Sequence, residues 1–400
     1  MQLEASLDGA HVVRPAEAEA ATALAVAVVP LCALAVTSTA VGMHWDICWH
    51  QSIGRDTFWS PPHLAIQFGA VLTGLCCLHV LWRATFGAAQ VRVAARGASV
   101  RVWGLRGPLG VFVAGWGGVA MLTSAPFDDW WHNTYGLDVK VLSPPHAVLV
   151  GGILVMQSGV LLLVLGERNR TAPDTLAHAR HDSLLLHVCG MALTCYLVLT
   201  LELLLPSYMH SGLFFRTVAL GVPLLLAVTH RASGQRWACT QAVGTYTALM
   251  LLLVWVFPLF PATPRLGPVY LPVSHLVPPP FPLLLIAPAA LLDVLLSRVP
   301  GWSDGRRAFW GGTLFLVSFA LVQWPFADFL MSPWARNPIF AADMFGYSTQ
   351  PSSYAYRHLF HDVEGTSERF VLNLALAWGL SVGMFRLGLA SGAWLLRLRR

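Results

Sequence analysis

Long apolar stretches alternate with short polar stretches along the whole chain. Most apolar stretches are close to the length of about twenty residues that an α-helix needs to cross the hydrocarbon core of a bilayer. This pattern predicts transmembrane helices at residues 21–43, 63–84, 108–126, 146–166, 183–204, 212–230, 237–257, 280–298, 308–330 and 370–391. We therefore expect an all-α fold: a polytopic integral membrane helical bundle of about ten transmembrane helices.

The composition agrees with a chain that is immersed in lipid. Hydrophobic residues make up 56% of the chain and charged residues 11%, whereas about a quarter of the residues of a soluble domain are charged. The seven cysteines form no C-x-x-C pair, so neither a disulfide framework nor a zinc ribbon is expected. The sequence also lacks a Walker loop, a G-x-G-x-x-G turn and a G-x-S-x-G elbow, which argues against an ATPase, a dehydrogenase and a serine hydrolase.

Arginine supplies almost all of the positive charge and is concentrated in particular loops. The formal net charge is +5, and Lys140 is the single lysine. Because the arginines form no continuous basic stripe, we do not expect nucleic acid to be a partner. The expected partner is the lipid bilayer, which the apolar stretches would cross. The positive-inside rule places the arginine-rich loops in the cytoplasm, namely 85–107, 167–182, 231–236 and 299–307.

This topology places both termini in the cytoplasm. The first apolar stretch lacks the basic flank and A-x-A-like site of a cleaved signal peptide, so we expect it to be retained. The other loops then lie on the outer, periplasmic face of what we expect to be a bacterial inner membrane: 44–62, 127–145, 205–211, 258–279 and 331–369.

Two of these outer loops repeat the same residues in the same order. Residues 46–63 read DICWHQSIGRDTFWSPPH, and residues 128–146 read DDWWHNTYGLDVKVLSPPH. Each joins an outgoing helix to an incoming one, so the repeat predicts two tandem helical hairpins of the same orientation. The expected segments are a cytoplasmic N-terminus at 1–20, motif-bearing hairpins at 21–84 and 108–166, further transmembrane helices at 183–330, an outer-face loop at 331–369, and a last helix with a basic tail at 370–400.

Both repeats have the residues of a metal site. An aspartate and a histidine stand four residues apart, and share one helix face if the outgoing helix extends that far. Ser-Pro-Pro then predicts the start of the returning helix, with a second histidine in its first turn. Two imidazoles and one carboxylate suit copper, iron or zinc with open coordination positions. The candidate ligands are Asp46, His50 and His63 in the first repeat and Asp128, His132 and His146 in the second.

Other polar residues of the repeats are candidates for supporting roles. Arg55, Asp56 and Asp138 could orient the imidazoles, or could equally cap turns. Gly54 and Gly136 are expected to allow the sharp turn between the helices. A simpler interpretation is that all of these polar groups only anchor helix ends at the interface. The presence of two matched copies favours metal binding over this simpler interpretation, since ionisable groups at membrane depth are energetically costly and usually functional.

The first repeat resembles a motif of the C subunit of the copper membrane monooxygenases, the particulate methane and ammonia monooxygenases. That motif has the form D-x-x-W-H-Q…R-D-T…P-x-H between membrane helices. The matching residues are Asp46, Trp49, His50, Gln51, Arg55, Asp56, Thr57, Pro61 and His63. The resemblance implies intramembrane copper at the aspartate and the two histidines.

The resemblance also implies a reaction, since enzymes of this family oxidise methane, ammonia or short hydrocarbons with dioxygen. These enzymes work as oligomers in which the C subunit joins an A and a B subunit. The resemblance covers only the repeats. The second copy lacks the Gln, Arg and Thr, and the family's subunit has fewer spans and one motif. The chain therefore resembles a distant relative of this C subunit in which the motif is duplicated. Other monooxygenase-like subunits or an electron donor are the partners that this resemblance implies.

Three functions remain open from the sequence. The first is a copper-dependent monooxygenase subunit that oxidises a small apolar substrate. The second is a non-catalytic protein of metal acquisition, storage or transport, and the third is a structural membrane subunit. Further ionisable candidates lie outside the repeats: Glu202 and Asp293 within apolar stretches, and His358 and His361, which are three residues apart.

Overall fold

The computed structural model describes residues 15–54, 58–89, 91–92, 99–136, 143–265, 273–342, 360 and 362–398, with side chains from residue 27 onward. Among these residues, nine helices are long and apolar enough to cross a membrane. They are α1 (Pro15–Ser52), α2 (Pro61–Phe86), α4 (Leu109–Tyr135), α5 (Pro144–Arg170), α6 (Leu176–Leu199), α7 (Gly212–Ser233), α8 (Ala238–Val256), α10 (Asp304–Met331) and α12 (Ser367–Leu395). The predicted all-α, polytopic membrane fold is confirmed.

In the described part of the chain, the other named elements are short. A tenth helix, α9 (Ile286–Arg298), has 13 residues, and a small antiparallel hairpin of β1 (Val100–Val102) and β2 (Leu105–Gly107) lies between α2 and α4. Four single 3-10 turns extend or link helices: η1 (Leu201–Leu203), η2 (Pro206–Tyr208), η3 (Phe257–Leu259) and η4 (Pro333–Ala335).

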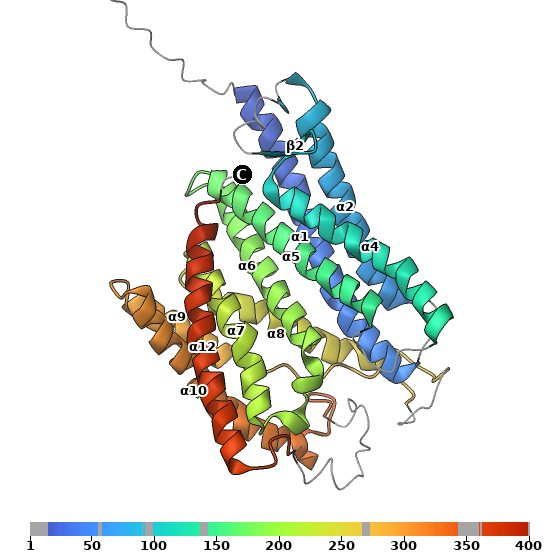
Figure 1. Cartoon of the computed structure of the whole chain (residues 1–400), viewed down its shortest axis with the longest axis vertical. Coiled ribbons are helices and arrows are strands. Elements are labelled where there is room, and N and C mark those ends of the chain that lie inside the picture. The colour runs from blue at the N-terminus through green and yellow to red at the C-terminus, as the bar shows by residue number, and fades with distance from the viewer. Residues whose placement is uncertain are drawn as a thin grey trace, which may run out of the picture.

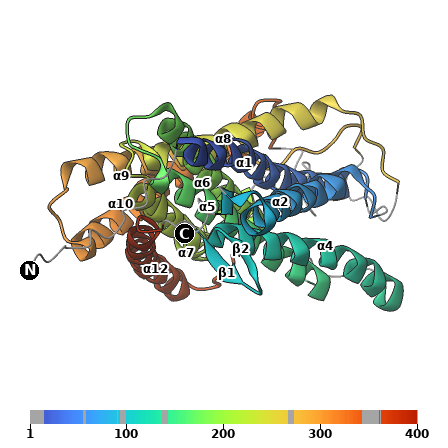
Figure 2. The same ribbon diagram turned by 90° about the horizontal axis from the view of Figure 1, so that it is seen from above.

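The first four long helices pack as two adjacent hairpins, α1 with α2 and α4 with α5 (Figure 1). Seen from above, these hairpins form one side of the bundle, and α9, α10 and α12 form the other (Figure 2). Glycines let α4 and α5 approach closely, because a methyl group at Gly117 would lie 2.2 Å from the Met156 nitrogen. Small residues serve this purpose in membranes, where close van der Waals packing is a main source of helix association.

The two ends of the bundle differ in chemistry. The basic end holds Arg168, whose guanidinium bonds Asp182 of α6 and the Ser233 carbonyl of α7, both at 2.5 Å. Asn169 beside it donates to the Leu398 carbonyl, just beyond α12. The opposite, motif end holds the turns of the two hairpins. The structure thus gathers residues from the arginine-rich loops at one end and both repeats at the other.

The outgoing helix of each hairpin continues through the aspartate and the first histidine of its repeat, as the metal hypothesis requires. The predicted ends of the first and third helices, at residues 43 and 126, are too early, since α1 continues to Ser52 and α4 to Tyr135. The returning helices α2 and α5 begin at Pro61 and Pro144, directly after the serine of each Ser-Pro-Pro. Each repeat therefore lies on two helix ends that face the same turn.

One predicted helix, at 280–298, is only partly helical. The described residues 276–285 are non-helical and mostly buried, and α9 begins only at Ile286. Prolines at 278, 279, 280 and 282 explain the difference, because proline has no N–H for the helical ladder and its ring clashes with the preceding turn. Residues 276–285 and α9 together lie between α8 and α10 in the chain, and we call this part the broken crossing.

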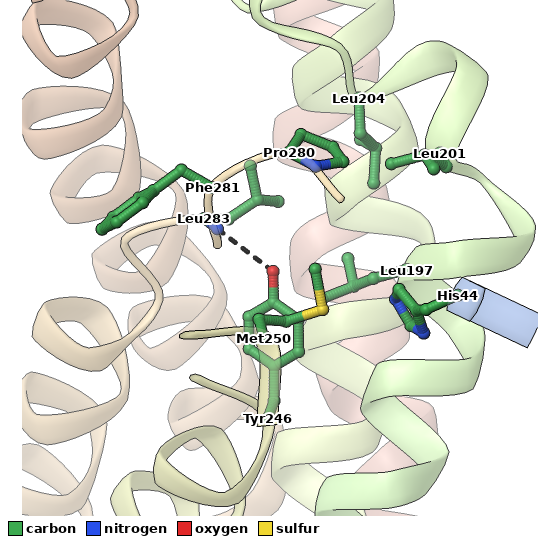
Figure 3. A pocket seen from close by; sticks show the side chains of 9 residues that line it. All are labelled: His44, Leu197, Leu201, Leu204, Tyr246, Met250, Pro280, Phe281 and Leu283. Atoms are coloured by element: carbon green, nitrogen blue, oxygen red, sulfur yellow. Dashed lines mark hydrogen bonds between the residues drawn. The ribbon is translucent and has the colours of Figure 1, made fainter. Parts of the chain in front are cut away.

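Side chains from other helices satisfy the backbone of this broken crossing. The Leu283 N–H donates to the Tyr246 hydroxyl of α8 at 3.1 Å, as Figure 3 shows, and the Leu284 N–H donates to Oε1 of Gln323 of α10 at 2.9 Å. Gln323 is fully buried. Non-helical backbone is tolerated at membrane depth only when it is buried in protein or faces water, and these acceptors meet that condition.

Replacing Tyr246 with phenylalanine is expected to destabilise the protein by about 1–3 kcal/mol, because the buried Leu283 N–H loses its acceptor while the ring is retained. Tyr135→Phe is the matched control, since that ring is 64% exposed. Unfolding in mixed detergent micelles, followed by circular dichroism, measures both. Equal stability of the two variants would contradict the role assigned to the Tyr246 hydroxyl.

Candidate metal centre

The first triad brings three candidate ligands to one point. Asp46 and His50 lie one turn apart near the end of α1, and His63 lies in the first turn of α2. Oδ1 of Asp46 is 3.0 Å from Nε2 of His63 and 3.5 Å from Nε2 of His50. One ligand atom from each residue lies within 4.8 Å of the other two. A single ion between two helix ends could contact all three.

The hydrogen bonds of the triad suit a metal. Nδ1 of His63 is 3.1 Å from the Phe58 carbonyl, so this nitrogen carries the proton and donates. In a neutral ring, Nε2 would then be the nitrogen that can bind a metal. Oδ1 of Asp46 is buried, and the polar atoms that approach it are the Nε2 atoms of His63 and His50. A buried carboxylate oxygen between two imidazoles fits a cation.

The other side of the α1 terminus is fixed by packing. Cys48 is fully buried in a small cluster with Leu253 and Phe257, and Trp45 and Trp49 pack against the same cluster. Since Cys48 faces this cluster, it has a structural role. This packing leaves the face of Asp46 and His50 turned toward α2.

Ser52 also ties the α1 terminus to the broken crossing. Its hydroxyl donates to the Cys48 carbonyl at 2.6 Å and accepts from the Val277 N–H at 2.7 Å. The end of the helix that carries two of the three ligands is thereby held by α8 and by the non-helical segment 276–285.

The second triad has the same arrangement but is wider. Oδ1 of Asp128 is 3.3 Å from Nε2 of His132 and 3.6 Å from Nε2 of His146. The three ligand atoms do not all lie within 4.8 Å of one another, unlike those of the first triad. Oδ1 of Asp128 is again buried between two imidazoles, and Nδ1 of His132 donates to the Gly136 carbonyl at 3.0 Å. His146 is also near enough to Asp46 for their charges to interact, so the triads are neighbours.

Several candidates from the sequence lie elsewhere. Arg55, Asp56, Asp138, His358 and His361 fall outside the residues that the structure describes, so their supporting roles stay predictions. Asp293 has a structural function: its carboxylate accepts from the Cys239 N–H, the Thr240 N–H and the Thr240 hydroxyl and thereby caps the start of α8.

The sequence analysis did not include the carbonyls of Phe58 and Gly136, which orient His63 and His132. No residue type marks a carbonyl acceptor, because its position depends on the path of the loop.

A small cavity lies on a different side of α1 from the triad. Figure 3 shows its lining, which includes His44, Tyr246, Met250, Pro280 and Leu283. His44 precedes Asp46 by two residues, so the two side chains leave the helix about 200° apart. Its Nδ1 is 2.8 Å from the Ala40 carbonyl. The cavity belongs to the broken crossing and contributes no ligand to the triad.

No model of a known protein family, no curated protein and no solved structure matches this chain.

Proposed function

We propose that this chain is a membrane metalloprotein in which Asp46, His50 and His63 bind one transition-metal ion. One observation carries the proposal: ligand atoms from two different helices converge within 4.8 Å of one another around a buried carboxylate oxygen. A repeat of the same arrangement at Asp128 supports a metal role for both hairpins.

Copper is the metal that we propose. Two imidazoles and a carboxylate accept several first-row metals, and among divalent ions copper binds such ligands most tightly. The resemblance of residues 46–63 to the copper monooxygenase C subunit favours the same ion. The ligand set alone also permits iron or zinc.

The site leaves room for an external molecule. Three protein ligands do not fill the coordination sphere of copper, and the side chains of Asp46, His50 and His63 are 24%, 37% and 26% exposed. Bound copper would supply one-electron redox chemistry with dioxygen. The protein would hold the ion near the outer membrane surface, where a small apolar substrate could arrive from the bilayer. Electrons would come from quinol or from a partner subunit.

Metal analysis tests the proposal. The detergent-purified protein, prepared without chelators, is expected to contain one copper per chain at the first triad, or two if the second triad is also loaded. His50→Ala is expected to lower the copper content by about one ion per chain, because it removes one of three ligands. His79→Ala, an exposed histidine elsewhere on α2, should leave the content unchanged. Inductively coupled plasma mass spectrometry measures all three proteins.

Copper that is unaffected by His50→Ala, or absent from the wild type after copper-supplemented growth, would contradict the proposal. A parallel His132→Ala variant reports on the second triad alone. Product formation that requires dioxygen and a reductant would then support an oxygenase. Stoichiometric copper without turnover would support metal acquisition, storage or transport.

A further inference from the structure

Three arginines from three different helices surround one aspartate at the basic end. Asp304 is the first residue of α10. Its carboxylate lies 3.6 Å from Arg231 of α7, 3.8 Å from Arg307 of α10 and 3.9 Å from Arg386 of α12. These groups are brought together by the tertiary fold, since they are up to 155 positions apart in the sequence.

One carboxylate leaves most of this positive charge and most of the donors unsatisfied. Each guanidinium has five N–H groups, and Arg231 and Arg386 have no other hydrogen bond or ion pair in the described part of the chain. Arg307 donates to the Pro300 carbonyl, but its Nε is buried without a partner. The cluster can therefore receive a further anion with several oxygen acceptors.

An aromatic and apolar surface continues from the cluster into the membrane. Phe309, Trp310 and Trp378 are 41%, 50% and 43% exposed, and the Phe309 ring contacts both tryptophan rings. Trp378 of α12 donates its indole N–H to the Thr313 hydroxyl of α10 at 2.9 Å, so this surface bridges the two helices. Residues 309–313 are five to nine positions beyond Asp304, about 8–14 Å deeper along α10.

We infer that this surface binds an anionic phospholipid, with its phosphate between Arg231, Arg307 and Arg386 and an acyl chain against Phe309, Trp310 and Trp378. Guanidinium groups bind phosphate oxygens through paired, charge-assisted hydrogen bonds. Arg386 is half exposed on a helix whose membrane-facing side is largely uncovered, so a lipid can reach it laterally. The apolar seat below the charges favours a lipid over free phosphate, and basic pockets between helices bind lipid headgroups in this way.

Delipidated full-length protein in a zwitterionic detergent provides the test. Phosphatidylglycerol is titrated while bound lipid is counted by native mass spectrometry, with phosphatidylcholine and inorganic phosphate as parallel probes. Wild type is expected to retain one phosphatidylglycerol in preference to phosphatidylcholine. Arg386→Gln is expected to weaken that binding about tenfold, the effect of losing one charge-assisted bond. Arg369→Gln removes the same charge from the exposed first turn of α12, at the motif end, and should bind like wild type.

Three results would overturn the inference. They are equal retention of both lipids, equal affinity in Arg386→Gln and wild type, and protection from thermal unfolding by inorganic phosphate as strong as that by phosphatidylglycerol. Trp378→Ala provides an independent arm, because it removes part of the apolar seat and leaves the charges. It should weaken lipid binding without changing the response to phosphate. A thermal scan of each variant without lipid checks that all of them fold.

Discussion

Asp46→Asn is expected to weaken copper binding at the first triad by on the order of a hundredfold or more, because it neutralises the group that both imidazoles approach. Changing a group that only supports a ligand already lowers metal affinity by about 10–100-fold, and a ligand itself should matter at least as much. Asparagine has nearly the same shape, so the helix ends should keep their positions. Competition with a chromophoric copper chelator in detergent measures the affinity.

The second hairpin contains a control for this change. Asp129 is adjacent to Asp128, but it is exposed, and it accepts a hydrogen bond from the Asn133 side chain instead of facing the two histidines. Asp129→Asn should therefore leave both sites intact. Asp128→Asn should affect only the second site, by a smaller factor if the wider geometry of that triad already makes its binding weaker. An affinity at the first triad that is the same in Asp46→Asn and Asp129→Asn would exclude Asp46 as a ligand.

The two triads could be anticipated because every step depends on local sequence. The spacing of Asp46 and His50 places both on one face if the helix continues, and Ser60-Pro61-Pro62 fixes the start of the next helix. The connection between the two helices then brings His63 near them. The sequence already distinguishes the second copy, which lacks the Gln, Arg and Thr of the first, but it does not predict the distances within each triad.

The broken crossing shows the opposite case. Residues 280–298 are as apolar as a spanning helix, and hydrophobicity dominates the local pattern. The prolines before residue 283 argue against a helix there, because proline lacks the N–H that a helix needs. However, the acceptors that satisfy the non-helical backbone come from Tyr246 and Gln323, on helices that precede and follow this segment. Pairings of this kind are set by the tertiary fold, and periodicity contains no information about them.

A single methyl group on α5 is expected to have a large and position-dependent effect on stability. Gly159→Ala would place its Cβ only 2.1 Å from the Ala114 nitrogen of α4, where backbone blocks any relaxation. Overpacking of this kind typically destabilises by about 1–3 kcal/mol, and we expect about 3 kcal/mol here because the clash is with main-chain atoms. Unfolding in increasing sodium dodecyl sulfate measures the loss.

Gly151→Ala is the matched control, because nothing lies within 4 Å of its added methyl on the same helix. Alanine is a better helix former than glycine, so this change should be neutral or stabilise by up to about 1 kcal/mol. The two variants are therefore expected to differ in sign. The α4–α5 contact also sets the distance between Asp128 and His146, so Gly159→Ala should weaken metal binding at the second triad and spare the first. Equal stability of the two variants would mean that α4 and α5 are not interlocked at this glycine, and metal loss at both triads would mean that the two hairpins do not move independently.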